Sequence, residues 1–287
     1  MLRLSAPAKI NLSLKVLGRR DDGYHLLDSL VAFADIGDTL FLQKADSTVL
    51  TVSGPFGITA GDDNLVKRAH AAMEAHIGHA LPCHMELQKN LPIASGLGGG
   101  SADAAAALRG LAQLYNLDAP LVDLAASLGA DVPVCLDSAP AIMRGIGHDI
   151  ERLNGLPFFD IVLVNPRQSV ETAAVFGVLS LDGTVEATPL PNINQPAALL
   201  DFLKMQGNDL QATACQIVPD IAACLAALDD CGFAYSAMSG SGTSCFGLCA
   251  PGSGRAMAAR YRTLREKDWV VAGRLIGASD TKIDEAD

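Results

Sequence analysis

Apolar and polar residues alternate near the start of the chain, and this alternation predicts a β-strand. Apolar residues occupy every second position from Ile10 to Val16, and polar residues stand between them. Successive side chains of a strand point to opposite faces, so Lys9 and Asn11 are expected to share the polar face. The alternation ends before a polar turn that is predicted from Gly18 to Gly23.

The rest of the chain mixes predicted strands and helices without strict alternation, which favours an α+β fold over a doubly wound sheet. Strand-like runs lie at 31–35, 38–43, 48–52, 83–88, 141–143, 159–164, 233–238 and 244–249. Helical patterns or helix start and stop residues mark 64–77, 101–115, 118–129, 170–179, 196–205 and 217–229, and a last helix and strand share 254–272. The pattern resets at 154–157, which predicts two domains, 1–155 and 156–287.

Composition narrows the class of protein. The chain has 287 residues, of which 49% are hydrophobic and 18% charged, as in ordinary globular proteins. The net charge of −11 argues against binding to nucleic acid or to an anionic membrane. We expect no signal peptide, because the first residues lack a basic segment followed by a long apolar run. No apolar run reaches the roughly 18 residues of a membrane span, and no C-x-x-C pair occurs among seven cysteines. We therefore expect a soluble, cytoplasmic protein, and its oligomeric state, monomer or homodimer, stays open.

A glycine-rich loop is the most informative segment of the sequence. Four of the five residues from Gly96 to Gly100 are glycine, and an alanine-rich helix is predicted to follow directly. Glycine allows positive φ angles and close approach of another group, and a helix N-terminus offers unpaired N–H groups to a phosphate. The chain contains no Gly-Lys pair, so the loop is not a Walker A motif. The Rossmann fingerprint and the protein kinase signatures are also missing.

Three segments together resemble a known kinase superfamily. The loop from Pro92 to Asp103 resembles the P-x-x-x-G-L-G-S/G-S/G/A-A/S motif of the galactokinase, homoserine kinase, mevalonate kinase and phosphomevalonate kinase (GHMP) superfamily. Residues Ala6–Leu12 resemble its first motif, and Ser239–Phe246 resemble its third. The resemblance implies an N-terminal domain like ribosomal protein S5 and a ferredoxin-like C-terminal domain, with the active site in the cleft between them.

The resemblance also implies which residues bind ATP, the phosphoryl donor. They are Pro92, Ile93, Ala94, Ser95, Gly96, Leu97, Gly98, Gly99, Gly100, Ser101 and Ala102. Ser95 departs from the pattern, because many relatives carry glycine or alanine there. Ser101 could instead act as an ordinary helix cap. Mg²⁺ is expected to accompany ATP, but it uses few protein ligands, so the sequence identifies none of them.

Further segments fit one branch of the superfamily, which phosphorylates the 2-hydroxyl group of a cytidyl-diphospho-methylerythritol in the non-mevalonate isoprenoid pathway. They are Pro7–Leu12, Arg20–His25, Gly96–Ser101 and Leu128–Pro133. The resemblance covers nearly the whole chain and weakens between residues 180 and 207.

The branch implies a catalytic pair. Lys9 would contact the reacting hydroxyl and the phosphate, and its charge would stabilise the transition state. Asp131 would accept the proton of the hydroxyl group. Without the resemblance, Lys9 reads as a solvated strand residue and Asp131 as a loop-capping aspartate.

The branch also implies a substrate site. Tyr24 would stack on the cytosine, His25 would hydrogen-bond the base, and Asn11 would contact the substrate from the same strand face as Lys9. Phe176 would cover the other face of the ring, with Thr172 close by. Ordinary packing in the core or at its edge accounts for Tyr24, Thr172 and Phe176 as well.

Two other functions stay open at this stage. A homoserine or mevalonate kinase would share the three motifs, but its substrate has no base for Tyr24 to stack on. A kinase-like ligand sensor without turnover would keep the glycine loop and lose the catalytic pair, whereas Lys9 and Asp131 are both present.

Overall fold

The computed structural model describes residues 1–57, 61, 63–180 and 183–276, and in these residues it has two antiparallel-rich sheets flanked by helices. The seven-stranded sheet contains β1 (Leu2–Asn11), β2 (Lys15–Arg19), β3 (His25–Lys44), β4 (Val49–Ser53), β5 (Cys83–Gln88), β6 (Ala141–Gly145) and β7 (Asp149–Arg152). The four-stranded sheet has the order β11-β8-β10-β9 and contains β8 (Asp160–Asn165), β9 (Tyr235–Met238), β10 (Cys245–Cys249) and β11 (Trp269–Arg274). This mixture confirms the predicted α+β class.

Strand β3 organises the first sheet. It is 20 residues long and pairs antiparallel with β1, β2, β5 and β6, whereas β4 joins the edge in parallel with β5. Two separate strands were predicted at 31–35 and 38–43, and the structure corrects this to one continuous strand. Its register against β1 shifts between Pro7 and Lys9.

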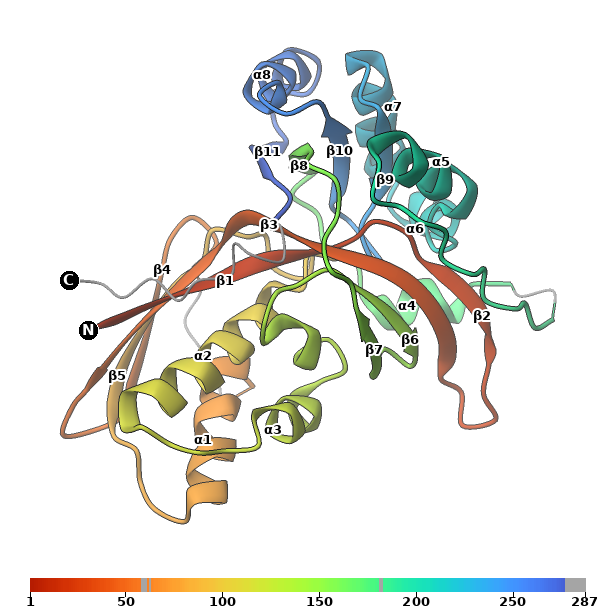
Figure 1. Ribbon diagram of the computed structural model, residues 1–287. Helices are drawn as coiled ribbons and strands as arrows, with labels where there is room; N and C mark the ends of the chain where they lie inside the picture. The colour runs from red at the N-terminus through yellow and green to blue at the C-terminus, as the bar shows by residue number, and fades with distance from the viewer. Residues whose placement is uncertain (58–60, 62, 181–182, 277–287) are drawn as a thin grey trace.

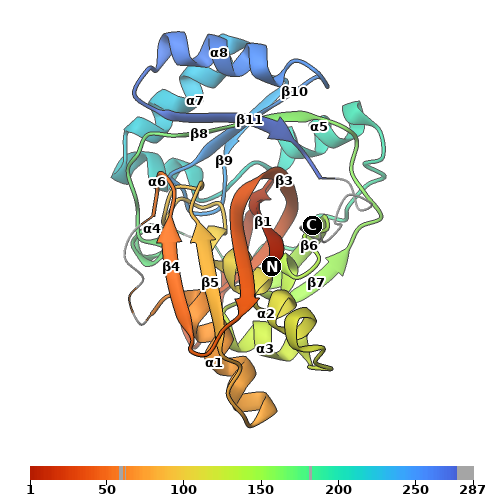
Figure 2. The same cartoon turned by 90° about the vertical axis from the view of Figure 1, so that its left-hand side faces the viewer.

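The helices form two outer layers. Helices α1 (Leu65–Ile77), α2 (Gly99–Tyr115) and α3 (Leu121–Leu128) cover one face of the seven-stranded sheet, and α7 (Asp220–Cys231) and α8 (Gly254–Leu264) cover the four-stranded sheet (Figures 1 and 2). The shorter elements are the 3₁₀ helix η1 (Pro133–Cys135), α4 (Thr172–Gly177), α5 (Pro196–Gln206) and α6 (Gln211–Ile217). None of the described helices combines the length and apolar character needed to cross a membrane.

The inner faces of the two sheets share one hydrophobic core. Ile10 of β1 and Ala32 of β3 pack in the same buried cluster as Ile161 of β8 and Phe246 of β10. A bridge between Ala34 and Leu275 adds a backbone connection. Strand β1 is therefore buried along its second half, from Ala6 to Asn11, between the helical layer and the second sheet.

Two further predictions need correction. The alternation from Ile10 to Val16 is not one strand, because β1 ends at Asn11 and Leu14 donates its N–H to the carbonyl of Gly207 instead of continuing the ladder. The helix predicted at 217–229 begins at Asp220, whereas the helix start predicted at 208–210 agrees with α6, which begins at Gln211. Pro219 separates the two helices, and a proline resists the interior of a helix.

Candidate active site

A pocket of about 990 Å³ brings most of the predicted site residues together. Lys9 and Asn11 come from β1, Asp131 follows α3, and Thr172 and Phe176 come from α4. The predicted ATP-binding residues that line it are Pro92, Ile93, Ala94, Ser95, Gly96, Gly98, Gly99, Gly100 and Ser101. Leu97 and Ala102 are buried behind this wall, and Tyr24 and His25 lie outside the lining.

The glycine-rich loop ends at a helix N-terminus without a side-chain cap. Helix α2 begins at Gly99, its N-cap is Gly98 with φ 61°, and no side chain bonds to its first turn. Ser101 therefore lies inside the first turn and is not the cap. The uncapped N–H groups and the helix dipole together favour a phosphate group at this end of the pocket.

Two glycines let the loop approach its neighbours closely. A Cβ atom on Gly96 would lie 2.2 Å from the carbonyl oxygen of Ser239, and one on Gly98 would lie 2.9 Å from Cβ of Lys9. Both glycines also have positive φ angles, which side chains disfavour. The glycines are thus required for contact with other segments as well as for backbone freedom.

A buried serine joins the third motif to the other two. The hydroxyl of Ser239 accepts a hydrogen bond from the N–H of Asn11 at 3.1 Å and donates one to the carbonyl of Gly96 at 2.8 Å. The N–H of Ser244 donates to the carbonyl of Ser95 at 2.9 Å. The segment after β9 therefore fixes the glycine-rich loop relative to β1.

The ammonium of Lys9 meets two polar side chains inside the pocket. Its Nζ lies 3.1 Å from Oδ2 of Asp131 and 3.2 Å from Oδ1 of Asn11. The Lys9 side chain is 4% exposed, whereas that of Asp131 is 42% exposed and can reach a bound molecule. Asn11 is oriented in turn by donating from Nδ2 to the hydroxyl of Ser29 at 2.8 Å.

Two of the predicted substrate-site residues form a stacked aromatic pair. The ring of Phe176 stacks on His25, with centroids 4.7 Å apart and planes at 28°. Tyr24 is 61% exposed. Desolvation and nearby Arg19 lower the pKa of His25, which favours its neutral form. Thr172 shares a hydrogen bond of 2.8 Å with Ser241, at the edge of the same pocket.

Sequence reasoning missed a buried charge cluster beside the glycine-rich loop. The ammonium of Lys89 contacts carboxylates of Asp38 and Asp103, and Lys89 and Asp103 also line the pocket. A single aspartate inside the alanine-rich helix was the available signal, since a carboxylate in such a run needs a partner when it is buried. Its partners lie on β3 and after β5, so the helix sequence alone does not reveal them.

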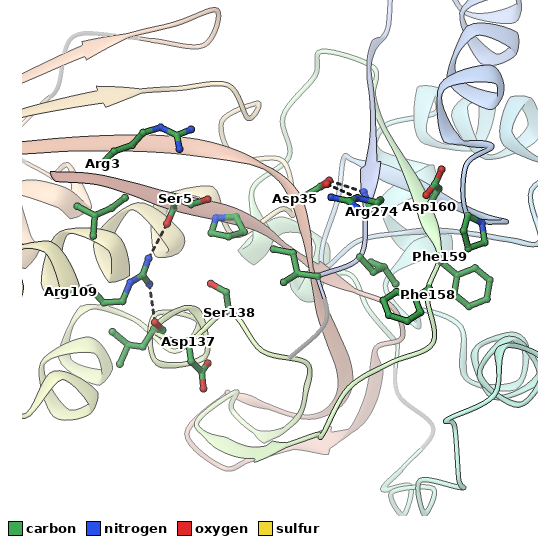
Figure 3. A pocket seen from close by; sticks show the side chains of 16 residues that line it. Arg3, Ser5, Asp35, Arg109, Asp137, Ser138, Phe158, Phe159, Asp160 and Arg274 are labelled. Carbon is green, nitrogen blue, oxygen red and sulfur yellow. Dashed lines mark hydrogen bonds and ion pairs between the residues drawn. The ribbon is translucent and has the colours of Figure 1, made fainter. Parts of the chain in front are cut away.

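A second pocket, of about 810 Å³, lies where β1, β11 and the segment after η1 meet (Figure 3). Arg109 donates there to the carbonyl groups of Ser5 and Leu136, each at 2.9 Å. Arg274 pairs with Asp35 at 3.1 Å. None of the predicted site residues lines this pocket, so the candidate active site is the larger one.

No metal centre is evident in the described part of the chain, where no group of three or more His, Cys, Asp or Glu side chains converges. Mg²⁺ retains several waters and binds phosphate oxygens together with one or two protein ligands. A site of that kind does not require such a cluster.

Two family models match this chain, and they cover the second and third of the three motifs. The GHMP kinases N terminal domain matches residues 64–145, and the GHMP kinases C terminal domain matches residues 190–267. A protein of Rhizobium leguminosarum bv. trifolii named 4-diphosphocytidyl-2-C-methyl-D-erythritol kinase is 49% identical over 252 residues, which are 85% of each chain. A protein of the same name from Sinorhizobium medicae is 45% identical over 97% of this chain and 96% of its own.

Solved structures agree with these matches. A crystal structure of 4-(cytidine 5′-diphospho)-2C-methyl-D-erythritol kinase has a TM-score of 0.81 and 33% identity, and the match covers 95% of this chain and 98% of that one. Homoserine kinase from Cytophaga hutchinsonii has a TM-score of 0.71 at 18% identity, which shows a shared fold. With relatives of this similarity over nearly its whole length, the chain belongs to the GHMP family of small-molecule kinases.

Proposed function

We propose that the protein transfers the γ-phosphoryl group of ATP to the 2-hydroxyl group of 4-diphosphocytidyl-2-C-methyl-D-erythritol. One observation carries the proposal: the ammonium of Lys9 and the carboxylate of Asp131 lie 3.1 Å apart in the pocket that the glycine-rich loop lines. Relatives that bear the corresponding name are 45–51% identical to this chain. We further propose a cytoplasmic location and the domain division 1–155 and 156–287.

The chemistry follows from the charges of the pocket. The phosphate tail of MgATP would lie on the N–H groups that open α2, where the helix dipole favours an anion. Lys9 would bridge the transferring phosphoryl group and the acceptor oxygen, since its ammonium is held in place by Asn11. Phosphoryl transfer depends mostly on positioning and charge stabilisation, which a buried, oriented ammonium supplies.

Asp131 is the proposed proton acceptor. Its carboxylate contacts Lys9 and is partly exposed to the pocket, so an incoming hydroxyl group could donate to it. The proton of the 2-hydroxyl group would pass to Asp131 while the hydroxyl oxygen of the substrate bonds to the γ-phosphorus. The bond between the γ-phosphorus and the bridging oxygen would break, and ADP would leave with its electron pair.

The cytidine end of the substrate would lie near α4, where Thr172 and Phe176 line the pocket. Phe176 stacks on His25, which follows Tyr24 directly in the chain. A cytosine ring that enters between Tyr24 and Phe176 would replace the stacking partner of Phe176. The stacked pair of His25 and Phe176 supports base recognition by aromatic stacking, which is worth about 1–3 kcal/mol per base.

The direct test is the identity of the product. Purified protein incubated with MgATP and the cytidyl-diphospho alcohol is expected to release ADP and one equivalent of the 2-phosphate, identified by mass spectrometry and phosphorus NMR. Mevalonate and homoserine are tested in parallel, with alcohol-free reactions as the background. Phosphorylation of mevalonate or homoserine without the cytidyl compound would overturn the substrate assignment, and ADP release that no alcohol stimulates would overturn the kinase assignment.

Replacing Tyr24 with alanine is expected to raise the KM for the cytidyl alcohol by about tenfold, because one stacking surface is lost. The KM for ATP should stay within about twofold, because the proposed partner of Tyr24 is the cytosine and the phosphates of ATP would lie at the glycine-rich loop. Steady-state kinetics with each substrate varied in turn measure both constants. Tyr24→Phe is the matched control, since it keeps the ring, and an unchanged alcohol KM in Tyr24→Ala would remove this residue from the substrate site.

A further inference from the structure

A charged cluster lies buried beneath the first turns of α2. The ammonium of Lys89 contacts Oδ2 of Asp38 and lies 2.7 Å from Oδ2 of Asp103. The three residues are 1–8% exposed. They come from β3, from the segment after β5 and from α2, so the cluster ties three elements together at the base of the glycine-rich loop.

The two carboxylates have unequal support. The second oxygen of Asp38 accepts hydrogen bonds from the N–H groups of Asn90 and Leu91 at 2.6 and 2.9 Å. The second oxygen of Asp103 is buried and has no hydrogen-bond partner among the described residues. Burial is the main reason that the pKa of Asp103 is raised to about 7, and the negative charge of Asp38 also raises it. Asp103 is thus the poorly compensated charge of the cluster.

The cluster carries one negative charge in excess when both carboxylates are ionised. It lies close to the proposed phosphate position, because a Cβ atom on Gly99 would be 3.3 Å from Oδ2 of Asp38 and 3.4 Å from Nζ of Lys89. Lys89 and Asp103 both line the pocket. The aliphatic part of the Lys9 side chain lies against Gly98, the N-cap of α2, so Lys9 is a second cation close to the start of this helix. Charges in this buried region are screened weakly by solvent.

We propose that the Lys89–Asp38–Asp103 cluster sets how tightly the glycine-rich loop holds the nucleotide phosphates, with Lys89 strengthening the binding and Asp103 opposing it. The proposal rests on ATP as the phosphoryl donor. An unsatisfied buried carboxylate beside an anion site weakens binding of that anion, so it also favours release of ADP after the reaction. Neutralising Lys89 and neutralising Asp103 are expected to change the affinity for the nucleotide in opposite directions, although these two side chains contact each other.

The test measures nucleotide affinity without turnover. The dissociation constant of MgADP is determined by isothermal titration calorimetry at about pH 8, where the Asp103 carboxylate is mostly ionised. Asp103→Asn, which keeps an acceptor for Lys89 and removes the charge, is expected to tighten MgADP binding by about tenfold. Lys89→Met is expected to weaken it severalfold, because the ammonium is lost while the Asp38 carboxylate, which accepts two backbone N–H groups, keeps its charge.

The controls separate charge from structure. Asp118→Asn removes the same charge from an exposed site in the turn after α2, and it should leave the dissociation constant unchanged. A cluster that only holds the fold together would weaken binding in both variants. If Lys89→Met does not fold, Asp103→Asn decides alone: equal or weaker MgADP binding than in the unmodified protein overturns the proposal. Failure of the unmodified protein to bind MgADP would instead overturn the proposed function.

Discussion

Replacing Lys9 with alanine is expected to lower kcat by about a thousandfold or more, while both substrates still bind. The reason is that the ammonium is buried, held by Asn11 and Asp131, and placed where charge develops on the transferring phosphoryl group. Single-turnover kinetics at saturating substrate measure the chemical step directly. Lys44→Ala removes an exposed ammonium from the same sheet and should retain normal turnover.

Asp131→Asn, tested in the same assay, separates the two members of the pair. If Asp131 acts as the base, the rate of the chemical step is expected to fall by about a hundredfold or more, with little change in substrate affinity. If the carboxylate mainly holds Lys9, the loss is smaller, since an amide oxygen still accepts from the ammonium. Near-normal turnover in Lys9→Ala or Asp131→Asn would show that the residue concerned is not part of the catalytic pair.

Replacing Gly96 with alanine is the second change with a large expected effect. The added Cβ would meet the carbonyl oxygen of Ser239 at 2.2 Å, so the loop must move away from the segment after β9. A destabilisation of about 2–4 kcal/mol is expected, together with a loss of MgADP binding of tenfold or more, because strain and a backbone clash act at one site. Urea unfolding and calorimetric titration measure the two effects.

Gly78→Ala is the matched control for this change. Gly78 caps α1 with φ 81°, and nothing lies within 4 Å of an added Cβ. It should therefore show only the cost of the positive φ angle, about 1 kcal/mol, with unchanged nucleotide binding. Equal effects of the two substitutions would mean that contact between the glycine-rich loop and Ser239 does not support the nucleotide site.

Local pattern was sufficient for the parts of the site that are continuous in sequence. The glycine-rich loop and the helix that follows it could be predicted because glycine and alanine restrict what that backbone can do. Lys9 and Asn11 could be placed on one strand face by their spacing. In contrast, the contact between Lys9 and Asp131 joins distant segments, and only the family resemblance implied it.

The failures have the same physical origin, which is that tertiary partners overrule local preference. The apolar alternation through Leu12 and Leu14 was read as one strand, but Leu14 finds its backbone partner at Gly207. Lys89 was not predicted as part of the site, yet it pairs with Asp38 and Asp103 inside the protein. The stacking of His25 on Phe176 likewise depends on segments that are far apart in the chain.

The hydrophobic core between the two sheets also limits how the enzyme can move. Ile10 and Ala32 of the seven-stranded sheet pack with Ile161 and Phe246 of the four-stranded sheet. The strand that carries Lys9 is therefore itself part of the contact between the two sheets. Separating the two sheets, each with its helices, would expose this apolar surface to water, at a large cost in free energy. We therefore expect ligands to enter and leave through rearrangement of loops and side chains around the active-site pocket, while the two sheets stay packed together during the catalytic cycle.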